Sequence, residues 1–234
     1  MKKYFAVLLA ALLLSGIMTL PAAARPTVTA HAGALDTEEN SLDNFQKVLT
    51  YLGIDVLECD LRFQDGVPVL SHLPSISGDP VTLGELFALA AATDCGVNLD
   101  LREIWGGDLA QASLLAEEYG IEDRVFFTGV HIVFLLAASK LKLPYYYNAY
   151  PLLSFSSLAN RLTCAFAKRI GAVGLNLPYY FCSENLVKTA HEMGLLVSVW
   201  TVDDEGAMHE MIAMGVDNIT TRSPDLLLAL LEGN

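Results

Sequence analysis

Short apolar runs alternate with longer segments of helical periodicity along most of the chain. The runs have the length and the β-branched content of buried strands, and the segments between them space their apolar residues as amphipathic helices do. Eight strands are predicted, at 28–33, 56–62, 97–102, 124–128, 144–149, 172–177, 196–202 and 217–221. Helices are predicted at 42–52, 109–119, 132–140, 156–170, 183–193 and 204–214. This alternation predicts an α/β protein, with a (βα)8 TIM barrel as the preferred architecture.

Turn-forming and helix-capping residues refine this prediction. Asp65-Gly66 lies between the second strand and the apolar run 67–72, which predicts a short β-hairpin excursion after strand 2. Ser41 is a suitable N-cap for the first helix, and Gly53 is a suitable stop. A doubly wound open sheet is the alternative, but no glycine-rich dinucleotide fingerprint follows any predicted strand.

The first residues of the chain differ from the rest. Lys2 and Lys3 precede an apolar run that extends to about Leu20, and Pro21-Ala22-Ala23-Ala24 follows it. A positive start, a short apolar centre and a small-residue end are the three parts of a secretory signal peptide, so residues 1–24 are predicted to be one. The alternative is an uncleaved membrane anchor.

Cleavage after Ala24 would leave residues 25–234 as a single barrel domain, near the lower size of ~200 residues for this architecture. We therefore expect a secreted or periplasmic protein. No later segment has the ~18 uninterrupted apolar residues that a membrane span requires, so no stable span is expected after cleavage.

The chain is strongly acidic, with a formal net charge of −13. A nucleic-acid backbone would be repelled, and we expect no nucleic-acid partner. An anionic small molecule would need the local help of a cation. The sequence leaves the oligomeric state open, and it leaves open the pairing of its cysteines except for Cys59, which is predicted to be a buried free thiol facing the helices.

Charged residues alternate with apolar ones inside two predicted strands. Glu58 and Asp60 share one face of strand 2, and Asp100 shares a face of strand 3 with Arg102. Their apolar neighbours should pack against helices, so these polar groups should point into the barrel. Inward carboxylates on adjacent strands need a compensating cation or ligand. A structural ion pair, of Asp100 with Arg62 or Arg102, is the alternative.

Two histidines bracket these carboxylates in the sequence. His31 and His72 each stand at the end of a strand-like run, where a barrel enzyme places its chemistry. Carboxylates can hold a hard divalent cation, and two imidazoles can give and take a proton on either side of a P–O bond. This is the set of groups that a metal-assisted phosphodiester hydrolase requires.

The order of the motifs resembles the glycerophosphodiester phosphodiesterase family over nearly all of residues 25–234. The matching segments are His31-Ala32-Gly33, Glu39-Asn40-Ser41, Glu58-Cys59-Asp60, Asp65-Gly66-Val67-Pro68-Val69, His72, Asn98-Leu99-Asp100-Leu101-Arg102, Trp200-Thr201-Val202 and Gly215-Val216-Asp217-Asn218-Ile219-Thr220. The resemblance implies a metal-dependent phosphodiesterase that hydrolyses glycerophosphodiesters to glycerol 3-phosphate and an alcohol.

Residue roles follow from the same resemblance. It places His31 and His72 on the catalytic acid and base. It places the ligands of one divalent cation, Mg²⁺ or Ca²⁺, on Glu58, Asp60 and Asp100. Arg102, Trp200 and Glu39 are expected to bind or support the substrate.

The sequence also departs from the family pattern. Ala32 stands where the family usually has Arg, which removes a guanidinium that would pair with phosphate. Leu73 replaces an Asp after the second histidine, Asp100 stands where Glu is usual, and Arg102 stands where Lys is usual. Two alternatives follow: a barrel phosphodiesterase for another lipid-derived or envelope diester, and a non-catalytic ligand-binding protein.

Several aromatic residues and a third histidine follow later strands. His131 follows strand 4, and Tyr145-Tyr146-Tyr147, Tyr150 and Tyr179-Tyr180-Phe181 follow strands 5 and 6 or lie at their ends. Head-group binding and aromatic packing between loops are both compatible with the pattern.

Overall fold

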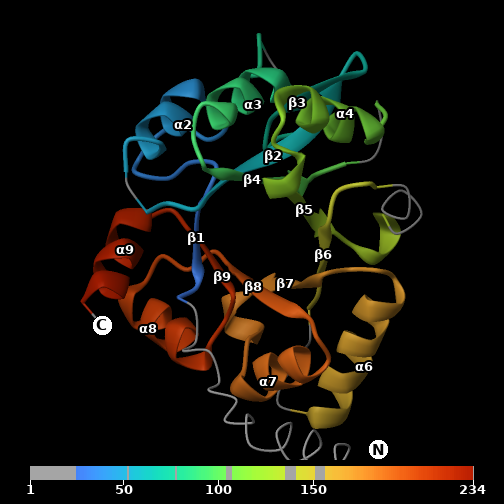
Figure 1. The fold of residues 1–234 in the computed structure, drawn as a ribbon, viewed down its shortest axis with the longest axis vertical. Helices are drawn as coiled ribbons and strands as arrows, with labels where there is room; N and C mark the ends of the chain where they lie inside the picture. The colour runs from blue at the N-terminus through green and yellow to red at the C-terminus, as the bar shows by residue number, and fades with distance from the viewer. Residues whose placement is uncertain are drawn as a thin grey trace, which may run out of the picture.

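Eight parallel strands close into a barrel in the computed structural model, which describes residues 25–51, 53–76, 78–103, 107–134, 141–150 and 156–233 (Figure 1). The ring strands are β1 (Thr27–Ala30), β2 (Val56–Gln64), β4 (Gly96–Leu101), β5 (Val125–Val130), β6 (Tyr145–Asn148), β7 (Gly174–Pro178), β8 (Leu196–Trp200) and β9 (Asn218–Thr221). The ring closes because β1 pairs in parallel with both β2 and β9. The predicted (βα)8 TIM barrel is confirmed, and the doubly wound alternative is wrong.

Helices surround the strands (Figure 1). They are α2 (Leu42–Val48), α3 (Leu83–Ala91), α4 (Ala110–Tyr119), α6 (Ser157–Arg169), α7 (Glu184–Glu192), α8 (Glu205–Met214) and α9 (Pro224–Glu232), with short 3₁₀ turns η1 (Glu122–Arg124), η2 (Ile132–Phe134) and η3 (Tyr179–Phe181). In the part of the chain that the structure describes, no helix is both long and apolar enough to cross a bilayer. The predicted signal peptide, residues 1–24, lies outside the described residues.

The structure corrects two helix predictions and adds two helices. The first helix begins at its predicted N-cap, Ser41, but ends at Val48 rather than at residue 52. The segment 132–140 was predicted to be one helix; its first three residues form the single turn η2, and 135–140 lie outside the described residues. Helices α3 and α9 were not predicted, although Thr82 and Glu85 form a capping box at the start of α3 and Pro224 occupies the first turn of α9.

The two faces of the strands separate as their alternation predicts. Leu57, Cys59 and Leu61 are buried in the apolar core on the outer side of β2. The inner side is polar and hydrogen-bonded: Thr128 donates to Asn98 at 2.8 Å, Asn176 donates to Asn148 at 3.0 Å, and Thr29 donates to Asn218 at 2.6 Å. Because buried polar groups need partners, this network lets the barrel carry a polar interior. All four cysteines are free, and Cys59 is buried as predicted.

The predicted hairpin excursion is present. β3 (Val67–Leu70) pairs antiparallel with β2 outside the ring, and Asp65 and Gly66 both have positive φ, as a tight two-residue hairpin turn requires. After β3 the chain returns to the end of the barrel strand, where the Ser71 N–H donates to the Asp60 carbonyl at 2.9 Å. The hairpin thus delivers His72 to the carboxyl end of β2.

Candidate active site

A cavity of about 520 Å³ opens at the carboxyl ends of the barrel strands. Seven of the eight residues that the sequence nominates contribute to its lining: His31, Glu58, Asp60, His72, Asp100, Arg102 and Trp200. The eighth, Glu39, lies beside the cavity with its carboxylate 3.9 Å from His72 Nδ1. The structure therefore brings together residues that are up to 169 positions apart in the sequence (200 − 31).

Three carboxylates converge in this cavity. Glu58, Asp60 and Asp100 each offer one oxygen, and these oxygens all lie within 4.8 Å of one another. Burial raises the pKa of Glu58 well above its ordinary value, and the charges of Asp60 and Asp100 raise it further. The Ala32 N–H donates to Glu58 Oε2 at 2.7 Å, which holds the carboxylate in place. Such a cluster stays ionised only with a compensating cation nearby.

Asn40 fixes the orientation of Asp60. Its side-chain amide donates to Asp60 Oδ2 at 2.8 Å, and its carbonyl oxygen accepts from the Asp60 N–H at 2.9 Å. The backbone of Asn40 has a φ of 58°, a conformation that Asn tolerates better than most residues do. Asn40 was not among the predicted site residues, although it lies in the Glu39-Asn40-Ser41 motif.

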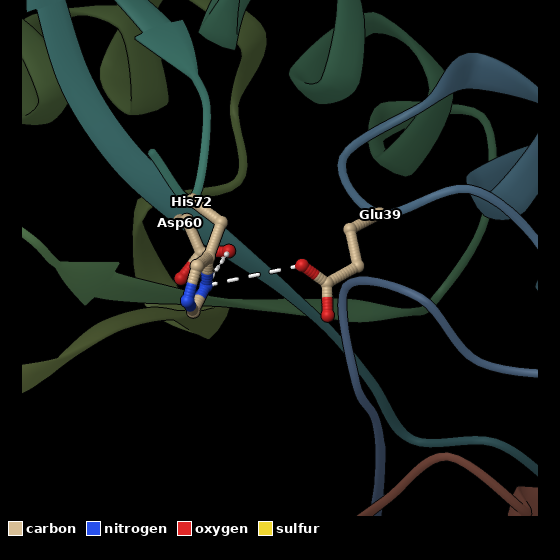
Figure 2. A group of neighbouring side chains, drawn as sticks. All are labelled: Glu39, Asp60 and His72. Atoms are coloured by element: carbon tan, nitrogen blue, oxygen red, sulfur yellow. Dashed lines mark hydrogen bonds and ion pairs between the residues drawn. The ribbon is translucent and has the colours of Figure 1, made fainter. Parts of the chain in front are cut away.

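His72 faces two carboxylates from different segments (Figure 2). Its Nδ1 is 3.3 Å from Asp60 Oδ2 and 3.9 Å from Glu39 Oε2, and the Arg102 guanidinium lies 3.2 Å from its Nε2. Glu39, Asp60 and His72 form a second set of potential metal ligands. This set shares Asp60 with the three-carboxylate cluster, so the two sets belong to one continuous site.

Arg62 holds the segment that carries His72. Its guanidinium donates to the Ser71 carbonyl at 3.1 Å and to the His72 carbonyl at 3.0 Å, and it forms an ion pair with Glu103 at 2.6 Å. Leu73, the next residue, is 61% exposed. Arg62 thus holds the backbone at Ser71 and His72, independently of the residue at position 73.

Arg102 forms one of the ion pairs that the sequence left as an alternative. Its guanidinium lies 2.8 Å from Asp100 Oδ2, and its Nε lies 3.4 Å from Asp60 Oδ1. Burial by itself would lower the pKa of Arg102, but Asp100 and Asp60 outweigh burial and the net pKa is raised. Arg102 therefore supplies a permanent positive charge against the carboxylate cluster.

His31 also lines the cavity, close to Arg222, which was not among the predicted site residues. Burial, followed by the charge of Arg222, lowers the pKa of His31, so its ring is neutral at neutral pH. The Gly33 N–H lies 3.3 Å from His31 Nδ1, at the long limit of a hydrogen bond, so that lone pair is only weakly engaged.

Arg222 itself lines the cavity directly after β9. The β1–β9 pairing brings it beside the segment after β1: the His31 N–H donates to Thr221 O, and the Leu35 N–H donates to Arg222 O, both at 2.9 Å. Its guanidinium lies 3.1 Å from Asp203 and 3.9 Å from Glu39. Arg222 directly follows a barrel strand, as His31 does, and this position in the sequence was the available signal that it belongs to the site.

Trp200 closes part of the cavity wall at the end of β8. Its indole nitrogen is buried and has no hydrogen-bond partner within the described part of the chain. A buried donor of this kind is normally satisfied by water or by a ligand. Trp200 thus offers a ligand in the cavity both an apolar face and one N–H group.

The fold and this site define a (βα)8-barrel hydrolase. The model of the glycerophosphoryl diester phosphodiesterase family matches residues 108–226. A glycerophosphodiester phosphodiesterase from Caldanaerobacter subterraneus subsp. tengcongensis is 24% identical over 221 residues, which cover 88% of this chain and 80% of that protein. This chain therefore belongs to the glycerophosphoryl diester phosphodiesterase family.

Solved structures share the fold over most of their length. A protein from Agrobacterium tumefaciens, assigned as a glycerophosphoryl diester phosphodiesterase, superposes with a TM-score of 0.79 at 16% identity, over 90% of this chain and 98% of that chain. An Oleispira antarctica phosphodiesterase, solved with its product sn-glycerol-3-phosphate, has a TM-score of 0.74 at 20% identity, over 89% and 97% of the two chains.

Proposed function

We propose that this protein hydrolyses glycerophosphodiesters to glycerol 3-phosphate and an alcohol. The observation that carries the proposal is the convergence of His31, His72 and three carboxylates on one cavity. Family membership supports it, as does the product bound to the Oleispira antarctica relative. Both histidines line the same cavity, which favours catalysis over the non-catalytic alternative.

The carboxylate cluster fits one divalent cation. Glu58, Asp60 and Asp100 would hold it, because carboxylate oxygens are the ligands that Mg²⁺ and Ca²⁺ prefer, and one oxygen from each lies within 4.8 Å of the other two. A cation held there would supply positive charge against the phosphate and the developing alkoxide. Arg102 would stay beside the cluster and face the phosphate with its remaining N–H groups.

The two histidines divide the proton transfers. His31, whose pKa burial and Arg222 keep low, takes the proton from the attacking oxygen as its bond to phosphorus forms. His72 gives a proton to the alcohol oxygen as its bond to phosphorus breaks. Asp60 and Glu39, which flank His72 Nδ1, orient the ring for this transfer.

Arg222 would replace the phosphate contact that Ala32 cannot make. Position 32 follows β1 and position 222 follows β9, and these strands are hydrogen-bonded neighbours in the barrel. The Arg222 guanidinium is 46% exposed and faces the cavity, and its ion-pair contacts with Asp203 and Glu39 are at 3.1 and 3.9 Å. A planar guanidinium matches two phosphate oxygens.

The decisive assay measures hydrolysis of glycerophosphocholine and glycerophosphoglycerol by the purified protein, with Mg²⁺ or Ca²⁺ and with chelator. His31→Ala and His72→Ala should each lower kcat by about 10²- to 10⁴-fold, the usual contribution of a general acid or base. His209→Ala, an exposed histidine on α8, serves as the control and should be unaffected. Absence of turnover on any diester, or turnover indifferent to both substitutions, would exclude the proposal.

Export is part of the same proposal and rests on the composition of residues 1–24. Fractionation of cells that express the full chain should place the protein outside the cytoplasm. Sequencing of its amino terminus should start at Arg25. A full-length chain recovered with the membrane would support the uncleaved anchor instead.

A further inference from the structure

Aromatic rings line one side of the cavity and continue beyond it. We call this the aromatic wall: His131, Phe134, Tyr150, Tyr180 and Phe181. The rings of His131 and Tyr150 are nearly parallel with centroids 5.8 Å apart, and Phe134 and Phe181 meet these two rings edge-on at 6.0 and 6.3 Å. Tyr180 packs on Phe181 at 4.8 Å. The wall is therefore a connected group of rings rather than a set of isolated side chains.

The wall and the charged groups occupy different parts of the barrel. His131 follows β5, Tyr150 follows β6 and Phe181 follows β7, which are consecutive strands of the ring. The carboxylates and the two catalytic histidines come from β1, β2, β4 and the hairpin. Three wall residues, His131, Phe134 and Tyr150, line the cavity itself. A diester whose phosphate lies at the carboxylates can therefore extend one of its two alcohols toward the wall.

The chemistry of the wall limits which alcohol it would recognise. Tyr150 is 49% exposed and Tyr180 is 69% exposed, so ring surface is accessible. Burial lowers the pKa of His131, which leaves its imidazole neutral. The opposite charges of Asp100 and Arg102 both act on His131 and on Tyr150. Neutral ring faces attract cations, most effectively cations that carry no N–H groups in need of acceptors. The net charge of −13 adds a general attraction for positive groups.

We propose that the aromatic wall binds the trimethylammonium group of a choline-type leaving alcohol, and so makes glycerophosphocholine-like diesters the preferred substrate class. This inference rests on the proposed function for the position of the phosphate. The alternative is that the wall binds an uncharged aliphatic alcohol by apolar contact alone. The experiment therefore compares leaving alcohols that have the same shape but differ in charge.

The test compares glycerophosphocholine with the glycerophosphate ester of 3,3-dimethylbutanol, in which a carbon atom replaces the quaternary nitrogen. The two leaving alcohols have the same shape and differ in charge. Wild-type kcat/KM should favour the choline ester by roughly five- to thirtyfold, the range expected for a cation on aromatic faces. Tyr150→Phe keeps the ring and should retain the preference, whereas Tyr150→Leu should lose most of it. Tyr51→Leu, an exposed tyrosine after α2, is the matched control.

Equal kcat/KM for the two esters would overturn the inference, and so would an equal loss on both esters in Tyr150→Leu. Either result leaves the proposed function intact, because turnover continues. Calorimetry of both esters with the His31→Ala protein measures the same preference without turnover. If the wild type hydrolyses neither ester, the proposed function fails, and the binding measurement alone tests the inference about the aromatic wall. Tighter binding of the choline ester would support that inference. Equal affinity for the two esters would reject it.

Discussion

The positive charge of Arg222 acts on His31 across the seam where the barrel closes, between β1 and β9. Burial is the largest cause that lowers the pKa of His31, and Arg222 comes second, while Asp60 and Glu39 act in the opposite direction. A general base must be neutral to accept a proton. A lowered pKa therefore keeps His31 competent at a more acidic pH than an ordinary histidine.

Arg222→Gln should shift the acidic limb of the kcat/KM profile to higher pH. Without the guanidinium, His31 binds its proton more readily, so the neutral base is lost earlier as the pH falls. KM should also rise, by about tenfold, if the charge-assisted hydrogen bond to phosphate contributes on the order of 1.5 kcal/mol. Rate profiles with glycerophosphocholine across the acidic range measure both effects.

The matched control is Arg161→Gln, an exposed arginine on α6. It removes the same charge from the protein without touching the cavity. If both variants show the same acidic limb as the wild type, Arg222 has no influence on His31.

At the scale of elements, the hairpin of β2 and β3 carries two parts of the site. Asp60 lies on β2, and His72 follows β3, so their distance depends on how the returning strand is held. Arg62 holds it through two backbone carbonyls and one ion pair. Arg62 touches no substrate in the proposed mechanism and acts as a positioning residue.

Arg62→Lys should lower kcat by roughly 10- to 100-fold with little change in KM, since a small misplacement of a catalytic group is enough to produce such a loss. A lysine ammonium keeps the charge opposite Glu103 but does not reproduce the rigid fork that reaches both carbonyls. Steady-state kinetics and thermal unfolding measure the two consequences separately.

Arg124→Lys provides the comparison, because Arg124 also bonds backbone carbonyls, those of Thr93 and Cys95, away from the cavity. It should change stability alone. An equal loss of kcat in both variants would show that the effect of Arg62 is general destabilisation.

The strands and their inward carboxylates were predictable because alternate residues of a strand face opposite sides, and this alternation can be seen within a few consecutive residues. Glu58, Cys59 and Asp60 reveal by alternation alone which groups face the barrel interior. The hairpin was predictable for the same reason, since Asp65-Gly66 suits only a tight turn.

Two helices and two arginines were harder to predict, for different reasons. α3 and α9 are dense in apolar residues, and a short apolar run of this kind does not by itself distinguish a helix from a buried strand. The cap at Thr82 and the proline at position 224 were the available signals for them. Arg62 and Arg222 act through contacts that depend on tertiary structure. The contact between positions 31 and 221, for example, exists only once the barrel closes.

At the scale of the whole molecule, the carboxylate cluster opposes folding when no cation is bound. Glu58 is buried, and burial, then Asp60 and Asp100, raise its pKa well above 4.5. Between the ordinary pKa of the unfolded chain and the raised pKa of the folded state, the folded protein holds a proton that the unfolded chain has released. The free energy of unfolding of the metal-free protein therefore falls as the pH rises through this interval.

Glu58→Gln should consequently stabilise the metal-free protein at neutral pH while abolishing cation binding and turnover. The amide has no charge to bury, and its carbonyl oxygen can still accept the Ala32 N–H that Glu58 accepts. The decline of stability with rising pH should also be weaker in the variant. Thermal unfolding in chelator across the range from acidic to neutral pH tests both statements.

Added Mg²⁺ or Ca²⁺ should reverse the order of stability. At a hundredfold excess over Kd, a cation adds about 2.7 kcal/mol to the wild type, or roughly 5–10 °C in Tm for a domain of this size. The variant, which lacks one of three ligands, should gain much less, whereas Glu122→Gln, an exposed control in η1, should respond as the wild type does. A Glu58→Gln protein that is less stable than the wild type in chelator would mean that the cluster contributes to the fold even without its cation, and that the cation is not what compensates the three charges.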